Sequence, residues 1–324
     1  MSFGRPYILN VDGCIHDGWL VISPFNNVLD KNYFYYLLSS EYAYQQFSEQ
    51  ASGAVVSNLN RDKVAGSLIP LPPQKEQIAI ASQIDLFFLR IECLESELAD
   101  VEHCISKVKE KILDLAIHGN LVTQNPSDEP AIELLRRINP SFKPSDNLHY
   151  EGPIPSGWQV CYLCDIFDVT MGQSPDGNSL NKTDGIEFHQ GKISFTEKYL
   201  SESEVFTSAP TKYATSNSLL CCVRAPVGVF NITPRTVCIG RGLCALTPRM
   251  DGVELDYWFY ALSRYREYYE GKSTGTTFKA ISGDTIRNTI VLLPPIREQK
   301  RIINKITELF TLLDRISYSI SSSE

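Results

Sequence analysis

The chain has 324 residues, of which 43% are hydrophobic and 21% are charged, and these values predict a soluble globular protein of about two domains. No stretch reaches the roughly 18 to 20 apolar residues of a membrane helix, and residues 1–10 lack the basic and apolar segments of a signal peptide, so we expect a cytoplasmic protein with no membrane segment. The net charge of −8 excludes a uniformly basic nucleic-acid-binding protein, but most of the acidity lies in residues 74–150, which leaves room for a local basic groove elsewhere.

Residues 1–73 repeat a later part of the chain. Residues 14–18 match 238–242, residues 32–36 match 256–260, and residues 71–77 match 293–299. These matches keep their order, which predicts two copies of one module. The match starts at Phe3-Gly4, which corresponds to Val227-Gly228. We therefore expect residues 1–73 to be the C-terminal half of a first module, without a counterpart of residues 158–225.

Residues 74–119 carry a heptad pattern. Apolar residues recur at 4-3 spacing between Ile84 and Leu115, which specifies a coiled-coil seam. Pro72-Pro73 suits the start of a helix, and Gly119 suits its end. Such a helix would be roughly 65 Å long. A structural coiled coil that only dimerises would fit the same pattern.

The last segment, residues 296–324, keeps the heptad register but is shorter. We expect it to pair antiparallel with the first part of the central helix, and to leave the heptads at about residues 101–115 for another protein. The residues of the expected seam are Ile84, Phe87, Ile91, Leu94 and Leu98 in the central helix and Ile306, Leu309, Leu313, Ile316 and Ile320 in the last one.

The segment 120–157 is expected to hold a short helix and a proline-rich linker. Ser127-Asp128-Glu129-Pro130 resembles a helix cap and first turn, and Asn139-Pro140 an end. Residues 158–295 then predict a mixed α/β module, with strands near residues 186–188, 219–223 and 243–246, a helix over 255–269, and a polar loop over 271–277.

Several short motifs follow one another along the chain. They are Gly172-Gln173-Ser174-Pro175, Phe188-His189-Gln190-Gly191-Lys192-Ile193, Arg224-Ala225-Pro226-Val227-Gly228, Ile239-Gly240-Arg241-Gly242, the loop at 271–277, and the twice-occurring Leu-Pro-Pro-x-x-Glu-Gln; Gly119-Asn120-Leu121-Val122 with Asp128-Glu129-Pro130-Ala131 lies at the centre. Each motif alone is weak. In this order, and with the duplication, they resemble the specificity subunit of type I restriction-modification enzymes over nearly the whole chain.

The resemblance implies target-recognition domains of α/β (mixed α+β) fold, separated by long coiled-coil helices. Each domain would read one half of a split site in double-stranded DNA, and the helices would dock methyltransferase (modification) subunits and the restriction subunit. It also implies a non-catalytic chain with no cofactor and no metal. The expected domains are 1–73, the C-terminal half of the first recognition domain; 74–119, the central helix; 120–157, the short helix and linker; 158–295, the complete second recognition domain; and 296–324, the C-terminal helix.

Base reading needs side chains that offer several hydrogen bonds, with Arg and Lys suited to guanine and Asn and Gln suited to adenine. Such residues in expected loops and strand ends are Gln173, Ser174, Gln190, Lys192, Arg224, Arg241, Lys272, Ser273 and Thr274. Each fits a solvated loop residue equally well. Arg224, beside buried strand residues, also fits the partner of a carboxylate.

Patterns of other chemistry are present but incomplete. Gly271-Lys272-Ser273 resembles the end of a phosphate-binding loop, but Arg266 stands where that loop needs glycine. Cys161-x-x-Cys164 has no second pair at metal-binding spacing, and we expect all nine cysteines to be reduced and buried. The proline pairs lack the flanking residues of an amino-methyltransferase motif, so methylation would belong to a partner.

Two alternatives stay open. The chain could be a truncated, non-functional or recombination-cassette remnant that acts at most as a coiled-coil interaction protein. It could instead form a two-fold homodimer, in which two copies of residues 158–295 would present an inverted-repeat site.

Overall fold

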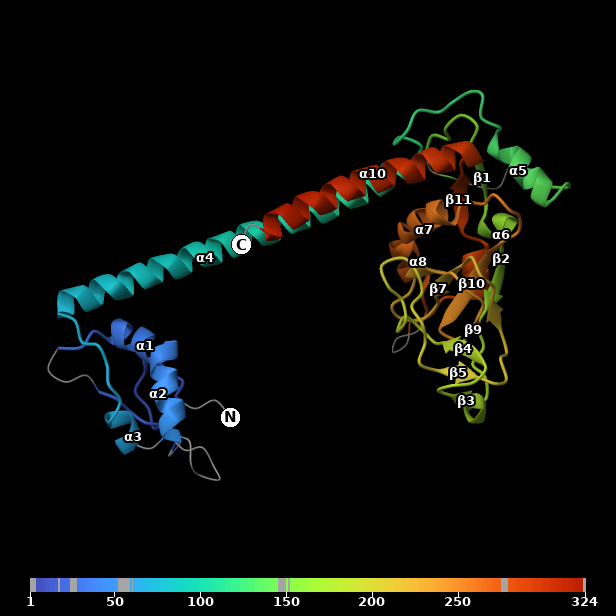
Figure 1. The fold of residues 1–324 in the computed structure, drawn as a ribbon. Coiled ribbons are helices and arrows are strands. Elements are labelled where there is room, and N and C mark those ends of the chain that lie inside the picture. The colour runs from blue at the N-terminus through green and yellow to red at the C-terminus, as the bar shows by residue number, and fades with distance from the viewer. Residues whose placement is uncertain are drawn as a thin grey trace. The chain divides into compact units, whose positions relative to one another are not determined.

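The computed structural model describes residues 4–16, 18–23, 28–51, 59, 61–144, 150, 152–274 and 279–322. The chain forms two compact units, Met1–Asp100 and Val101–Glu324. One helix, α4 (Gln74–Ile117), begins in the first unit and ends in the second (Figure 1). Among the described residues, no helix is both long and apolar enough to cross a bilayer.

Helix α4 confirms the heptad prediction. Its 44 residues correspond to about 66 Å. The backbone N–H groups of Glu76 and Gln77 donate to the carbonyl of Pro73 at 2.8 and 3.1 Å. The two prolines thus precede the first helical turn, where a backbone N–H would have no helical partner.

The first unit packs three short helices near the start of α4. They are α1 (Lys31–Ser39), α2 (Glu41–Ala51) and α3 (Arg61–Ala65). The buried apolar side chains there are Tyr33, Ala43, Phe47 and Ala81. In the described part of residues 4–23 no strand forms, and many large apolar side chains are exposed. Asp17 and Pro24, which belong to the predicted repeat, lie outside the described residues.

The second unit contains three sheets. A two-stranded antiparallel sheet joins β1 and β11, a four-stranded antiparallel sheet has the order β2-β10-β7-β8, and a five-stranded sheet has the order β3-β5-β4-β9-β6, in which β4 and β9 are parallel. The strands are β1 (Gln159–Tyr162), β2 (Phe167–Met171), β3 (Leu180–Asn181), β4 (Ile186–His189), β5 (Phe206–Thr207), β6 (Tyr213–Ala214), β7 (Ser218–Cys222), β8 (Phe230–Thr233), β9 (Val237–Ile239), β10 (Leu243–Pro248) and β11 (Ile290–Leu293). The predicted strands near 186, 219 and 243 are confirmed.

Helices cover these sheets and form the other half of the core. They are α5 (Ala131–Ile138), α6 (Leu163–Ile166), α7 (Leu255–Ser263), α8 (Arg266–Lys272), α9 (Gly283–Arg287) and α10 (Ile296–Ser321), with a short 3-10 helix at Gly177–Ser179. Strands β3, β4 and β5 lie at the end of this unit that is remote from α5 and the start of α10 (Figure 1). The buried side chains of α7, Tyr257 and Trp258, pack into the same core as Phe167 of β2.

The predicted helix over 255–269 is two helices, so its continuity was wrong. The chain turns at Arg264 and Tyr265, where the N–H groups donate to the carbonyls of Ala261 and Leu262 at 3.2 and 3.0 Å. Arg264 then donates from Nε to Asp114 of α4 at 2.8 Å. The break therefore places a cation against the second-unit part of α4.

The segment after α4 belongs to the second core. Leu134 and Leu135 of α5 are buried among the same side chains as Trp158, and the Ala131 N–H donates to the Gly157 carbonyl at 2.8 Å. The predicted cap at Ser127-Asp128 is wrong, because α5 starts after Pro130 with no side-chain cap. Asp128 instead accepts from Arg301 of α10 at 2.6 Å. Of the predicted linker, residues 145–149 and 151 lie outside the described residues.

Candidate nucleic-acid interface

The loops after the parallel strands β4 and β9 lie at one edge of their sheet, because the carboxyl ends of parallel strands meet there. The Gly240 N–H donates to the His189 carbonyl at 2.9 Å, and the Gln173 N–H donates to the Ile239 carbonyl at 2.9 Å. A longer contact of 3.5 Å runs from the Arg241 N–H to the Ser174 hydroxyl. The backbone thus joins the loops that carry Gln173, Ser174, Gln190, Lys192 and Arg241.

A second set of loops carries the remaining predicted residues. Ala280 forms antiparallel bridges with both Arg224 and Thr274, and the Ala225 N–H donates to the Lys279 carbonyl at 3.2 Å. The expected polar loop begins later than predicted, because α8 continues to Lys272. Its residues 275–277 lie outside the described residues.

The two sets are connected through Val223. Its N–H donates to the Gly242 carbonyl at 3.0 Å, and its carbonyl accepts from the Ile281 N–H at 3.0 Å. All nine predicted residues therefore stand on one hydrogen-bonded group of loops, which we call the interface loops: residues 172–174, 189–193, 223–225, 240–242, 272–274 and 279–281.

Glycine is required where two of these loops cross. A Cβ atom on Gly172 would overlap the carbonyl oxygen of Gly240, which is backbone and cannot rotate away. The Gly172 N–H also donates to the Leu243 carbonyl at 2.9 Å. This close approach of two backbones fixes the position of Gln173 relative to Arg241.

The cations of the interface loops have no carboxylate partner within the described residues. Lys192, Arg224, Arg241, Lys272 and Lys279 are all exposed, and the ion pairs found in this module involve other cations, such as Arg235, Arg249 and Arg287. Among the described residues no carboxylate therefore pairs with Arg224, in contrast to the carboxylate partner that its place beside buried strand residues also allowed. The Lys272 ammonium lies 5.9 Å from the centre of the Tyr268 ring. An acidic chain therefore presents a local group of unneutralised positive charges.

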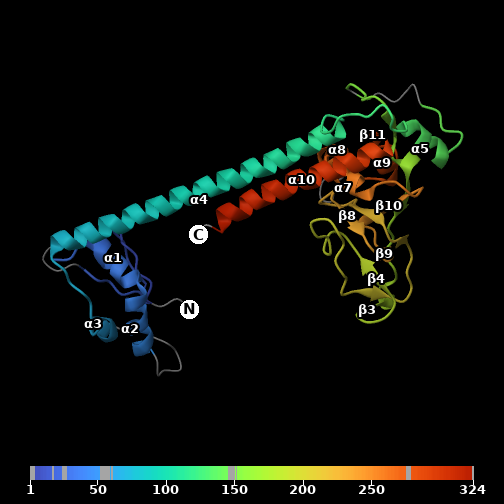
Figure 2. The same ribbon diagram turned by 45° about the horizontal axis from the view of Figure 1, so that its top comes forward.

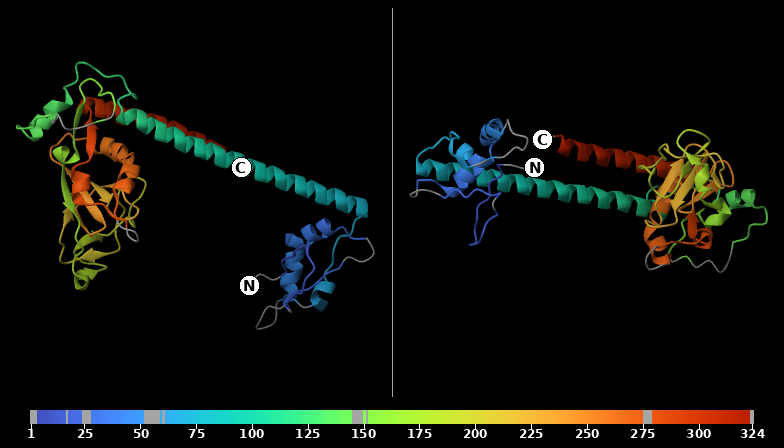
Figure 3. Two further views of the ribbon diagram at one scale, coloured as in Figure 1. Left: turned by 180° about the vertical axis from the view of Figure 1, so that it is seen from behind. Right: turned by 90° about the horizontal axis from the view of Figure 1, so that it is seen from below.

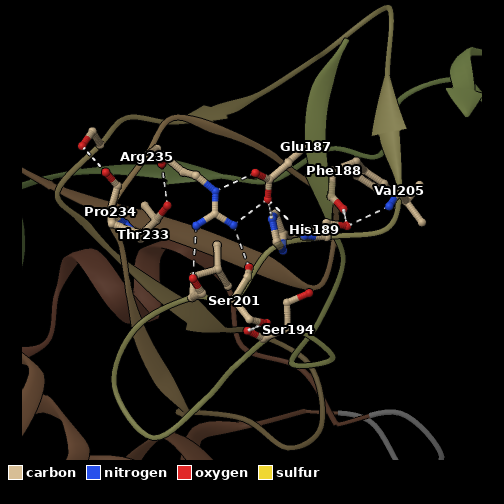
Figure 4. A network of polar contacts seen from close by, with 12 residues as sticks. Glu187, Phe188, His189, Ser194, Ser201, Val205, Thr233, Pro234 and Arg235 are labelled. Carbon is tan, nitrogen blue, oxygen red and sulfur yellow. Dashed lines mark hydrogen bonds and ion pairs between the residues drawn. The ribbon is translucent and has the colours of Figure 1, made fainter. Parts of the chain in front are cut away.

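A partly buried ion pair between Arg235 and Glu187 lies beside this region (Figure 4). Arg235 donates from Nε and Nη2 to the two carboxylate oxygens of Glu187, at 2.6 Å each, and also reaches the carbonyls of Leu200 and Ser201 at 3.2 and 2.8 Å. Paired in this way, the guanidinium fastens the loop around residue 200 to β4.

The pKa of Glu187 reflects these contacts. Burial opposes ionisation of the carboxyl, but hydrogen bonds from Arg235, His189 and the Ser203 N–H outweigh it and lower the pKa to about 2. Burial lowers the pKa of His189, whose Nε2 lies 3.1 Å from Glu187. The other ring nitrogen, Nδ1, is buried and has no hydrogen-bond partner among the residues that the structure describes. A neutral imidazole beside an ionised carboxylate fits these surroundings.

Residue patterns missed several members of this region. Glu187 and Arg235 are far apart in sequence and meet only because β4 pairs with β9, which spacing alone does not reveal. Lys279 is an exposed cation beside Arg224. It belongs to none of the sequence motifs, so the sequence did not point to it. Ile193, the last residue of the motif at residues 188–193, is 93% exposed.

The cysteines differ in part from the prediction. Cys161, Cys221, Cys222, Cys238 and Cys244 are buried free thiols, but Cys14, Cys93 and Cys104 are exposed. Cys93 and Cys104 lie on α4 outside its heptad seam. Burial raises the pKa of the Cys161 thiol, which disfavours the thiolate that metal binding or redox chemistry needs.

Helix α10 packs against the last part of α4, as Figures 2 and 3 show. Lys109 pairs with Asp314 at 2.6 Å and lies 5.3 Å from the centre of the Phe310 ring. Ile306 is fully buried, and Leu309 and Leu313 pack against the same core as Ile112. The antiparallel direction agrees with the expectation.

The expected register of this pairing was wrong. The heptads from 101 to 115, which we expected to be free, contain the residues that α10 covers, because Trp158 and the neighbouring core bring α10 to that end of α4. The earlier residues Phe87, Ile91 and Leu94 are 58%, 48% and 64% exposed, while Ile84 and Leu98 are partly exposed. On α10, Ile316 and Ile320 are also exposed.

Comparison with known proteins gives a consistent result. The family model described as the type I restriction modification DNA specificity domain matches residues 1–103 and 155–320. A putative type I restriction enzyme MjaX specificity subunit of Methanocaldococcus jannaschii is 31% identical over 299 residues, which cover 91% of this chain and 65% of that protein.

Two solved structures are also similar. The HsdS subunit from Thermoanaerobacter tengcongensis has a TM-score of 0.57 at 25% identity, over 90% of this chain and 65% of that one. A structure described as the basis of complex assembly and conformational transition of the type I R-M system has a TM-score of 0.58 at 26% identity, over 90% and 66%. The chain spans less than two thirds of the length of each of these relatives. The family model matches most of the chain, the fold is shared with the two solved structures, and the Leu-Pro-Pro-x-x-Glu-Gln sequence precedes both α4 and α10. The chain therefore belongs to the type I restriction-modification DNA specificity family.

Proposed function

We propose that the chain is a non-catalytic specificity subunit whose interface loops read one half of a split site in double-stranded DNA. The observation that carries the proposal is the set of five exposed cations, Lys279 included, that have no carboxylate partner among the described residues, on loops that also present Gln173 and Gln190. Lysine and arginine that neutralise phosphates supply affinity, whereas bidentate side chains at base edges supply specificity. Both kinds of side chain stand on the same connected backbone.

The partners follow from family membership and from the helices. Methyltransferase and restriction subunits would dock on the helical part of the chain, where α4 leaves apolar side chains such as Phe87, Phe88 and Leu94 exposed. Such an unpaired apolar stripe is typical of a surface that another protein covers. We propose the cytoplasm as the site of action, since a DNA-reading complex must meet the chromosome there.

The first experiment tests the absence of catalysis. The purified chain is incubated with DNA and the methyl donor, alone and with the methyltransferase subunit of its system. We expect methylation only in the mixture. Methylation or cleavage by the chain alone, at a rate that scales with its concentration, would overturn the non-catalytic assignment.

The second experiment tests which residues read DNA. Methylated sites are mapped by sequencing in cells that carry this gene and its methyltransferase, and again after residues 158–295 are replaced by those of a relative. We expect one half-sequence to be constant in the first cells and to change after the exchange. If the chain works as a two-fold dimer, the constant half-sequence will be inverted. Sites unaffected by the exchange would show that these residues do not read DNA.

A further inference from the structure

Ile193 has the most exposed large apolar side chain among the residues that the structure describes. Its exposed fraction is 93%, and Leu68 and Tyr318 come next at 75% each. A single exposed apolar side chain needs no functional explanation by itself. What Ile193 can do therefore depends on how its backbone is held and on the side chains around it.

The backbone on both sides of Ile193 is fixed. The Phe195 N–H donates to the Lys192 carbonyl at 3.0 Å, which closes a turn with Ile193 and Ser194 at its centre. Phe195 packs against a buried core formed by side chains of β7, β9 and β10. The Ser194 carbonyl accepts two hydrogen bonds from Ser201, from the N–H at 3.0 Å and from the hydroxyl at 2.9 Å. The turn thus presents the Ile193 side chain to solvent from a backbone that is held at both ends.

The turn is also tied to the strand that leads into it, as Figure 4 shows. Ser201, which holds Ser194, accepts at its own carbonyl from Arg235 Nη2 at 2.8 Å. Arg235 in turn pairs through two nitrogens with Glu187 of β4. None of these contacts uses the Ile193 side chain, so a substitution there should leave the turn in place.

The turn lies among side chains that suit nucleic acid. A Cβ atom on Gly242 would lie 3.2 Å from the Gly191 nitrogen, which places the turn against the loop of Arg241. Arg241 and Lys192 are exposed cations with no carboxylate partner among the described residues, and Gln190 is an exposed amide. Cations attract phosphates, and glutamine suits the major-groove edge of adenine. The apolar side chain at the centre of the turn therefore stands among groups that suit both the phosphates and the base edges of a duplex.

We propose that Ile193 recognises thymine in the target half-site, through apolar contact with the 5-methyl group of the base. Among the groups that base pairs present in the major groove, this methyl group is the one that suits an apolar side chain. The neighbouring cations favour DNA over a protein as the occupant. A protein without facing carboxylates would bury them unpaired, which costs free energy, whereas DNA supplies phosphates. The inference rests on the function proposed for the interface loops.

The test couples one substitution in the protein to one in the DNA. The complex of the full chain with its methyltransferase subunit is titrated with oligonucleotides that carry the mapped methylation site, and Kd is measured. In each oligonucleotide one thymine of the half-site read by residues 158–295 is replaced by uracil, which lacks the 5-methyl group but keeps the pairing edge. The protein is either wild type or Ile193→Ala. The control variant Ile154→Ala removes the same atoms from another exposed isoleucine, 53% exposed, in the segment before β1.

At one thymine position, we expect uracil to weaken binding by the wild type and by Ile154→Ala about fourfold, the effect of one methyl group removed from apolar contact. Ile193→Ala should bind the thymine oligonucleotide about fourfold more weakly than the wild type, and uracil at that position should weaken it no further. This loss of the uracil effect in one variant alone would support the contact.

Equal effects of uracil on the wild type and on Ile193→Ala would overturn the inference, as would a half-site without an A·T pair. An Ile193→Ala chain that binds the methyltransferase more weakly, with unchanged affinity for DNA, would also overturn it, because Ile193 would then contact a protein. Lys192→Ala separates this failure from failure of the proposed function. If Lys192→Ala still weakens DNA binding, only the thymine contact is wrong. If neither variant changes affinity or specificity for DNA, the proposed function fails as well.

Discussion

Gln77 and Gln299 make the same contact at the start of two different helices. Each side-chain amide nitrogen donates at 2.9 Å to the carbonyl of the first proline of a Leu-Pro-Pro sequence, Pro72 or Pro294, and both side chains are fully buried. In the first unit, Gln77 also donates to the Val28 carbonyl at 3.0 Å and accepts from the Asp30 N–H at 2.8 Å. The repeated motif therefore specifies a buried clamp that fixes how the chain enters α4 and α10.

The clamp predicts a stability effect. Gln299→Ala leaves the Pro294 carbonyl buried without its partner, so we expect the free energy of unfolding to fall by about 1–3 kcal/mol. Gln83→Ala, at an exposed position of α4, is the control and should change it by less than about 0.5 kcal/mol. Denaturant unfolding followed by circular dichroism measures both. Equal effects of the two variants would contradict the clamp.

The observed register of α4 and α10 predicts a contrast within one helix. Ile306 is 0% and Ile316 is 49% exposed. We expect Ile306→Ala to lower the free energy of unfolding by about 2–5 kcal/mol, because it leaves a cavity in the core. Ile316→Ala, which removes the same atoms from an exposed site, should cost less than about 1 kcal/mol. If α10 paired with the first part of α4, as the sequence led us to expect, both isoleucines would lie in the seam and the two substitutions would lower the free energy of unfolding by similar amounts.

The close approach of Gly172 to Gly240, where two interface loops cross, predicts that a substitution there weakens DNA binding although it leaves the charge of the protein unchanged. Gly172→Ala would overlap the Gly240 carbonyl, whereas Gly177→Ala meets nothing within 4 Å. We expect the first variant to weaken DNA binding by about tenfold or more, which is a change of about 1.4 kcal/mol, and the second to leave it unchanged. Titration of a methylated-site oligonucleotide with the subunit complex measures this. Equal binding by both variants would place the crossing outside the interface.

The unpaired cations predict two kinds of variant. If Lys272 or Arg241 contacts phosphate, its replacement by alanine weakens binding similarly for all sequences and reduces the slope against log salt by about one. If it contacts a base, specificity at one position relaxes by about 1–3 kcal/mol. Lys305→Ala, which removes a partly exposed cation of α10 that pairs with Glu308, is the control. A variant with unchanged affinity and slope would place that residue outside the interface.

The Glu187 network predicts loss of stability in acid. The folded pKa of Glu187 is about 2, below its ordinary value of 4.5, and that of His189 lies below 6.5. In both cases the unfolded chain binds protons that the folded chain does not, so stability falls as pH falls. The contribution of His189 is lost below pH 6.5. That of Glu187, about 3 kcal/mol at most, is present above pH 4.5 and is lost as pH falls toward 2.

Arg235→Met tests this assignment, because it removes the guanidinium that keeps Glu187 ionised. We expect the variant to be less stable than the wild type at neutral pH, with a difference that shrinks as pH falls below 4.5. Arg249→Met, which breaks the exposed pair with Asp168, should show no such pH dependence. Unfolding free energies measured across this range decide the matter, and a constant difference for Arg235→Met would contradict the assignment.

Sequence patterns predicted the helices well and their contacts poorly. The heptad pattern predicted α4 because the spacing of apolar residues follows the periodicity of a single helix. The same spacing does not say which turns of two helices meet, and that depends on Trp158 and α5, which draw α10 to the end of α4. The nine candidate DNA-reading residues were chosen by their types, which stays a prediction, whereas the contact of Glu187 with Arg235 depends on the pairing of β4 with β9.

The ion pairs Arg264–Asp114 and Arg301–Asp128, at 2.8 and 2.6 Å, have a mechanical consequence. They fasten α7 to α4, and α10 to the segment that follows α4, at positions where the surrounding side chains are also packed. A force applied to the loops of the second module would therefore rotate that module together with the last turns of α4 as one rigid body.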